Sequence, residues 1–82
     1  MNDLLKKLKN MSRFEVINYK IGYYKYSICK SVFNDGYTVV CALKNITEHF
    51  SNEERVVEFI KGRLSKSERQ FLIEKGELKY EQ

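Results

Sequence analysis

The chain has 82 residues and a mass of 9.8 kDa, and its 15 Lys and Arg against 11 Asp and Glu leave a net charge of +4. This length predicts one domain over residues 1–82, and the 43% of hydrophobic residues exclude a wholly disordered chain. No apolar run approaches the roughly 18 residues that span a bilayer, and two cysteines with one histidine exclude a disulfide scaffold and a structural zinc site. We therefore expect a cytoplasmic protein without a signal peptide, membrane contact, metal or cofactor.

The first expected element is an amphipathic helix over residues 2–11. Asn2 or Asp3 is the expected N-cap, and the Ser12-Arg13 pair ends the pattern. Four apolar side chains recur at helical spacing along one face: Leu4, Leu5, Leu8 and Met11.

From Phe14 to Lys44 the sequence is rich in β-branched and aromatic residues, which favour strands. We predict a three-stranded antiparallel meander with a bend near Gly22 between its first two strands. The strands cover residues 14–20, 28–33 and 37–43.

The Asp35-Gly36 pair predicts a two-residue type I′ turn between the second and third strands. A three-residue loop that also includes Asn34 is the alternative, but it mixes polar and apolar side chains on both faces, so we prefer the shorter turn. The preferred register pairs Asn34 with Tyr37, Val32 with Val39, Lys30 with Cys41, and Ile28 with Leu43. One face then collects Tyr24, Tyr26, Ile28, Val32, Val39, Cys41 and Leu43.

Two helices are expected after the meander. Ser51 with Glu54, and Ser65 with Glu68, both have the spacing of a capping box. Gly76 fits the C′ position that ends the second helix. Residues 77–82 form a polar tail, from which Leu78 and Tyr80 could fold back. The predicted fold is α+β in the order α-β-β-β-α-α.

Few residues suggest catalysis. His49 beside Glu48 has the composition of a general-base pair, but we interpret His49 as one polar residue of a loop after the last strand. Cys29 is predicted to face outward opposite Ala42, and Cys41 to face the core. Because the thiols point to opposite sides of the sheet, we expect no disulfide. We expect a protein that is not an enzyme.

Basic and aromatic residues suggest two binding surfaces. In the first, Tyr19, Tyr24 and Tyr26 interleave with lysines; Tyr23 would stack on a base and three lysines would contact phosphates. The structural alternative is that the tyrosines belong to the core and the lysines protect a sheet edge. The phosphate-binding lysines are Lys20, Lys25 and Lys44. The second surface, which is alternatively a salt-bridged helix face with Glu58 and Glu68, comprises Lys61, Arg63, Lys66 and Arg69.

The opening Asn2-Asp3-Leu4-Leu5-Lys6-Lys7-Leu8-Lys9-Asn10, followed by Phe14-Glu15-Val16, resembles the start of small anti-CRISPR proteins that inhibit Cas9. The resemblance implies the α-β-β-β-α-α order and a phage or mobile-element protein that acts stoichiometrically. Those inhibitors are acidic whereas this chain is basic, so none of their functional residues is carried over. The element order is also similar to that of double-stranded-RNA-binding domains, but the Lys-Lys pair that opens their last helix is replaced here by residues 52–55.

The sequence thus favours a small non-enzymatic binding protein or inhibitor, directed at a protein or ribonucleoprotein partner. The grounds are its size, its lack of catalytic motifs, the resemblance, and a composition typical of low-GC genomes. The alternative is a nucleic-acid-binding regulator that uses the basic and aromatic face of the sheet.

Overall fold

Four antiparallel strands form a single sheet in the order β1-β2-β3-β4. The computed structural model describes residues 2–31 and 35–76. Its elements confirm the predicted α+β class, with one strand more than expected. In chain order they are α1 (Asn2–Lys9), β1 (Val16–Ile21), β2 (Tyr24–Lys30), β3 (Tyr37–Cys41), the 3-10 helix η1 (Ala42–Lys44), β4 (Ile46–Phe50), α2 (Glu53–Arg63) and α3 (Lys66–Glu74).

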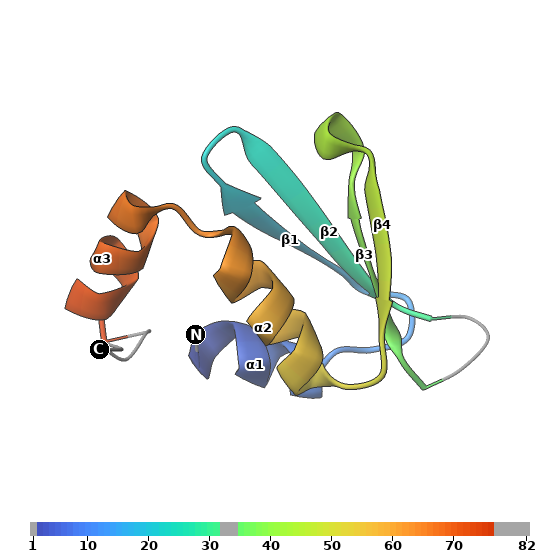
Figure 1. The fold of residues 1–82 in the computed structure, drawn as a ribbon. Helices are drawn as coiled ribbons and strands as arrows, with labels where there is room; N and C mark the ends of the chain where they lie inside the picture. Colours follow the sequence, from blue (N-terminus) through green and yellow to red (C-terminus); the bar gives the residue numbers. More distant parts are fainter. Residues whose placement is uncertain (1, 32–34, 77–82) are drawn as a thin grey trace.

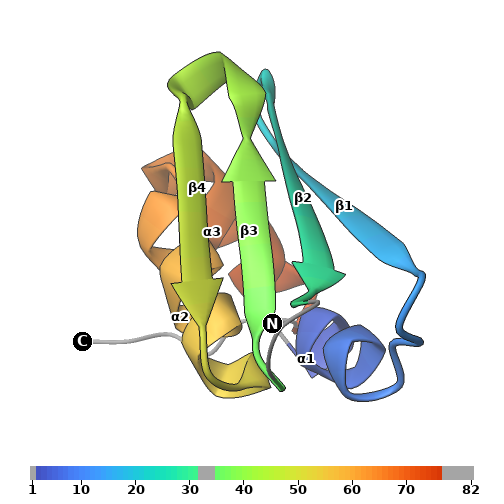
Figure 2. The ribbon, with the colours of Figure 1, turned by 90° about the vertical axis from the view of Figure 1, so that its right-hand side faces the viewer.

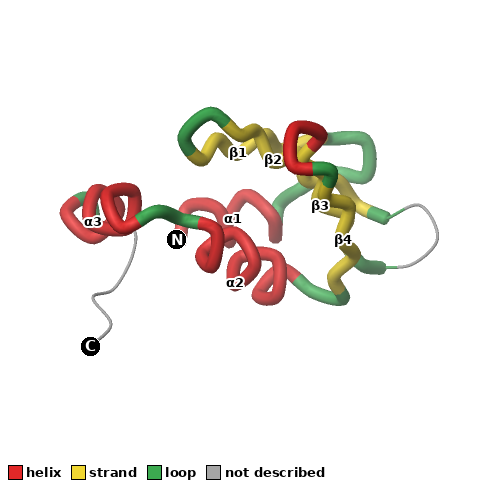
Figure 3. Tube along the Cα trace, turned by 45° about the horizontal axis from the view of Figure 1, so that its top comes forward, coloured by secondary structure: helices red, strands yellow, loops and turns green. Residues whose placement is uncertain are grey.

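The helices α1 and α2 cover one face of the sheet, and the opposite face carries no helix in the described part of the chain (Figures 1 and 2). Helix α3 extends to the side of α2, away from the sheet (Figure 3). Because side chains alternate along a strand, every second residue of β3 faces the covering helices. Tyr37, Val39 and Cys41 face the helices and are buried, whereas Thr38 and Val40 face the uncovered side.

The core lies between the sheet and the two covering helices. Ile28 and Val39 are paired across β2 and β3 and have no exposed surface. The hydroxyl of Tyr37 donates a hydrogen bond to the carbonyl of Leu8 (3.3 Å), which joins the end of α1 to the sheet. The buried residues contributed by the helices and the segments that follow them are Leu4, Leu8, Met11, Val56, Ile60 and Leu64.

The predicted register between the second and third strands is wrong by four residues. Ile28 pairs with Val39 instead of Leu43, and Lys30 pairs with Tyr37 instead of Cys41. Ser31 N donates to the carbonyl of Gly36 (2.9 Å), so residues 31–36 connect the strands and Asp35-Gly36 is not a two-residue turn. Val32 and Asn34 lie outside the described residues. Because the shift is even, the residues within the observed strands keep their predicted faces, and Leu43 is the exception among the described residues.

The first hairpin carries the tight turn instead. Ile21 pairs with Tyr24, so only Gly22 and Tyr23 lie between the strands, as the predicted bend near Gly22 implied. Gly22 has a φ of 61°, which glycine adopts at little cost, and it occupies the first central position, where tight hairpin turns place this residue.

The predicted third strand ends early, and a fourth follows it. After Cys41 the chain turns through η1 and returns at Asn45, whose φ of 54° is left-handed. Asparagine tolerates this conformation better than other non-glycine residues. His49 therefore lies within β4, not in a loop, and Leu43 is 77% exposed instead of facing the core.

The helix ends follow local chemistry with one correction. Asn52, not Ser51, caps α2, because its side-chain oxygen accepts from Arg55 N at 2.9 Å. The predicted capping box of Ser65 with Glu68 is confirmed at the start of α3. Gly76, with a φ of 79°, follows the C-cap of that helix as predicted. The predicted polar tail, residues 77–82, lies outside the described residues.

Candidate interaction surface

The two turns at one end of the sheet lie side by side. The Gly22-Tyr23 turn and η1 both project from the end that is uppermost in Figure 1. The ammonium group of Lys44 sits 4.4 Å from the centre of the Tyr24 ring, which ties η1 to the start of β2. This cation–π contact connects η1 with the strand that follows the Gly22-Tyr23 turn.

Two more lysines approach the same end from the uncovered face. Lys20 and Lys25 are direct partners across β1 and β2, and their side chains point to the same side of the sheet. Like charges opposite each other on a sheet are destabilising. An anionic partner would relieve this repulsion.

The most exposed apolar side chains of this end stand on the turns. Tyr23 is 96% exposed and Leu43 is 77% exposed. We call the whole set the hairpin-end surface, and it contains Lys20, Tyr23, Lys25, Leu43 and Lys44. It combines two solvated apolar groups with three cations and has no carboxylate of its own.

The structure therefore brings together the four residues that the sequence proposed for the first surface, on both sides of one sheet end. It does not form the predicted interleaved face, because Tyr19, Tyr24 and Tyr26 point toward the helices. Tyr26 is only 1% exposed and packs edge-on against Phe59. Sequence reasoning missed Leu43, which an apolar pattern alone places in a strand.

The second predicted surface joins α2 to α3. Arg69 Nη2 donates to the carbonyl of Lys61 at 2.7 Å and so satisfies a carbonyl at the end of α2. The Arg63 guanidinium lies 4.6 Å from the centre of the Phe59 ring. Arg69 thus links α3 to the end of α2, Arg63 packs on a ring of its own helix, and Lys66 is exposed at the start of α3.

His49 and Glu48 do not form a general-base pair. They are neighbours on β4, so their side chains point to opposite faces of the sheet. His49 Nδ1 lies 3.0 Å from Thr38 Oγ1 on the uncovered face, in the pairing of β3 with β4. The histidine therefore fits a cross-strand polar contact.

The two cysteines face opposite sides of the sheet, as predicted, and both are free thiols. Cys41 is buried at 1% exposure among the core residues. Cys29 is half-buried on the uncovered face and pairs with Thr38, not with Ala42. Among residues 2–31 and 35–76, no group of three or more His, Cys, Asp or Glu side chains is placed to hold a metal ion.

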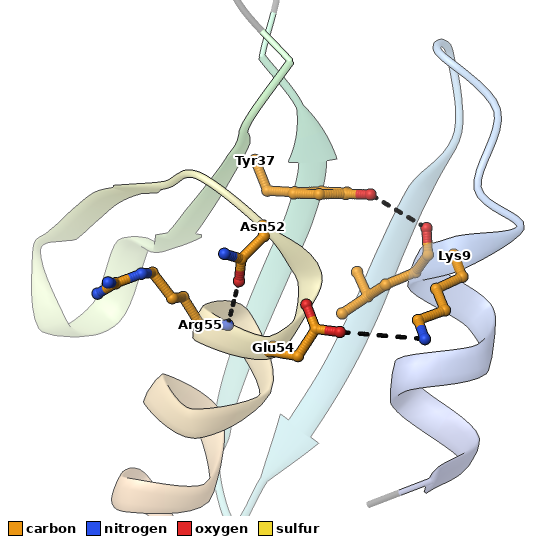
Figure 4. Close-up of polar contacts among 6 residues, drawn as sticks. Lys9, Tyr37, Asn52, Glu54 and Arg55 are labelled. Atoms are coloured by element: carbon orange, nitrogen blue, oxygen red, sulfur yellow. Dashed lines mark hydrogen bonds and ion pairs between the residues drawn. The ribbon is translucent and has the colours of Figure 1, made fainter.

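Polar and charged side chains gather where α1, β3 and α2 meet (Figure 4). Burial raises the pKa of the Tyr37 hydroxyl above its ordinary value of 10.0, and the nearby Glu53 and Glu54 carboxylates raise it further. The Lys9–Glu54 ion pair is long, at 4.0 Å, and largely exposed, so it adds little. The neutral Tyr37 hydroxyl thus donates to the Leu8 carbonyl and links α1 to the sheet.

None of the helices in the described part of the chain is long and apolar enough to cross a membrane. Comparison of the chain with protein-family models, with curated proteins and with solved structures gives no match.

Proposed function

We propose that the protein is a small non-enzymatic binding protein, which acts stoichiometrically on a protein or nucleoprotein partner through the hairpin-end surface. The observation that carries the proposal is the exposure of Tyr23 and Leu43 on two adjoining turns, among three lysines. Protein interfaces combine an apolar centre with a polar rim, and tyrosine is frequent among the residues that dominate their affinity.

The lysines indicate the chemistry of the partner. Lys20, Lys25 and Lys44 share the end of the sheet with the apolar pair, and the set contains no carboxylate, so the complementary surface is acidic. The resemblance of the first residues to Cas9 inhibitors suggests a CRISPR nuclease as the first partner to test. We propose that inhibition would then saturate at one protein per nuclease.

The test uses single-residue variants of the full chain. Pull-down from a bacterial lysate, with and without nuclease treatment, identifies a candidate partner, and calorimetry with the purified partner then measures its affinity. Tyr23→Ala is expected to weaken binding by about 30-fold or more, the equivalent of the roughly 2 kcal/mol of an interface hot spot. Phe14→Ala is the matched control, because Phe14 is 94% exposed but precedes β1 at the other end of the sheet.

Equal effects of Tyr23→Ala and Phe14→Ala would show that the hairpin-end surface does not bind the partner. A partner that disappears on nuclease treatment would point to the alternative, a nucleic-acid-binding regulator. The paired Lys20 and Lys25 support that alternative. Under that alternative, the affinity for nucleic acid falls steeply as the salt concentration rises. The triple variant with Lys20→Ala, Lys25→Ala and Lys44→Ala would then reduce the slope of log affinity against log salt concentration by about 0.7–0.9 for each phosphate that is no longer neutralised.

A further inference from the structure

A groove runs along the outer edge of β1, between α1 and α3. Its volume is about 340 Å³, which falls within the range of roughly 300–1,000 Å³ that is usual for ligand sites. Leu4, Ile17 and Leu72 supply apolar lining from three different elements. Lys7 and Lys75 add a cation from α1 and from the C-cap of α3.

The lining shows that the groove follows the backbone of β1. Ile17, Asn18 and Tyr19 all line it, although they are consecutive residues of one strand. Consecutive side chains point to opposite faces of a sheet, so Ile17 and Tyr19 meet the groove from the side of the helices, with Asn18 between them. The groove therefore reaches the edge of β1 at Asn18.

This edge has hydrogen-bonding groups to offer. β1 is the first strand in the sheet order, and no described strand pairs with its outer side. Ile21 and Tyr24 flank a two-residue turn, and such a pair is a hydrogen-bonded one. Because the pattern alternates, Val16 and Asn18 direct their N–H and C=O groups outward. An unpaired edge of this kind is a template for another strand.

We propose that the β1 edge is a binding site for an extended acidic peptide segment of a partner protein, which adds a strand to the sheet. Every second side chain of the peptide would face the helices, where apolar ones would enter the space between Leu4 and Leu72 and carboxylates on that same face would approach Lys7 and Lys75. Lys7 lies 3.8 Å from Asp3, in an exposed pair that another carboxylate can replace. The site is separate from the hairpin-end surface and does not depend on it.

The probe is an acetylated, amidated heptapeptide with glutamate, leucine, leucine and glutamate at alternate positions and serine between them, so that both kinds of side chain share one face. It is titrated into the isotopically labelled full chain and followed by amide NMR. We expect the Val16 and Asn18 amides to shift and to exchange more slowly with solvent. The matched peptide with lysine in place of each glutamate is expected to bind several-fold more weakly. Equal binding of the two peptides, or shifts confined to another surface, would overturn the proposal.

Asn18→Pro tests the backbone contact. Proline removes the outward N–H of Asn18 but no hydrogen bond to β2, so it is tolerated on an edge strand, and peptide binding is expected to be abolished. Asn18→Ala is the control, because it keeps the N–H and removes only the side chain that accepts from Ser27 Oγ (2.9 Å). Unchanged peptide binding by a folded Asn18→Pro variant contradicts strand addition.

A second measurement does not depend on how the proline variant folds. Only every second N–H group of an added strand faces the β1 edge, so two probes are compared, one N-methylated at the odd residues and one at the even residues. Binding is expected to fail only for the probe whose methyl groups replace the N–H groups that face β1. Equal binding of both probes would overturn strand addition. A variant with both Leu78→Asp and Tyr80→Asp tests whether the end of the chain itself occupies the groove. If the peptide binds this variant but not the unsubstituted chain, the proposal of a partner peptide is overturned.

Discussion

Two glycines of this chain are predicted to respond in opposite directions to the same substitution. Gly22 lies in the β1–β2 turn with a φ of 61°, and Gly62 lies within α2. A Cβ added at either position meets no atom within 4 Å. Packing therefore makes no difference between them, and only the backbone conformation decides the effect of alanine.

The magnitudes follow from that conformation. A left-handed backbone conformation destabilises the folded state by about 1–2 kcal/mol when the residue is alanine. Alanine also lowers the entropy of the unfolded chain, which offsets roughly 0.4–1 kcal/mol of that loss. Gly22→Ala is thus expected to destabilise by about 1 kcal/mol, which lowers the Tm of a domain this size by about 4–8 °C. Gly62→Ala gains up to about 1 kcal/mol of helix propensity. Since Gly62 is next to the last residue of α2, roughly half of that gain is expected.

Thermal unfolding followed by circular dichroism measures both variants under the same conditions. The expected result is a lower Tm for Gly22→Ala and a Tm for Gly62→Ala that is a few degrees higher than that of the unsubstituted chain. Gly22→Asn should lie between Gly22→Ala and the unsubstituted chain, because asparagine tolerates positive φ. An unchanged Tm for Gly22→Ala, or a shift of the same sign in both alanine variants, would refute the tight turn at Gly22.

Three further predictions test the core and the helix ends. The raised pKa of Tyr37 means that the folded state favours the neutral hydroxyl, so the stability that this hydroxyl contributes is complete below pH 10 and declines above it. Urea unfolding between pH 9 and pH 11 should therefore show a smaller decrease in stability for Tyr37→Phe than for the unsubstituted chain. Asn52→Ala should lower the free energy of unfolding by about 1 kcal/mol in the same assay, because it removes the N-cap of α2. An equal loss in Ser51→Ala would show that Ser51 caps the helix, against the observed structure. In the native protein, mass spectrometry after brief alkylation should find Cys29 modified before Cys41, since Cys41 is 1% exposed; the reverse order would contradict the placement of Cys41 in the core.

The candidate surface shows how far local reasoning extends. The sequence identified Tyr23 and three lysines as a set. Lys20, Tyr23 and Lys25 stay together because they are close in sequence within one hairpin, whereas Lys44 joins them through η1. The sequence placed the neighbouring tyrosines wrongly on the same surface, although alternation sends them toward the helices. It also missed Leu43, since only the end of β3 after Cys41 turns that side chain into solvent.

The sequence by itself determined the α+β class, the helix faces, the cap at Ser65 and the side of the sheet to which each cysteine points. These depend on periodicity and on contacts between near neighbours. The tertiary structure alone decided the register of β2 with β3 and the existence of β4. A shift of four residues keeps every side chain on its face, so a period of two cannot detect it. The contact of Tyr37 with the end of α1, and the burial of Ile28 against Val39, occur only in the observed pairing.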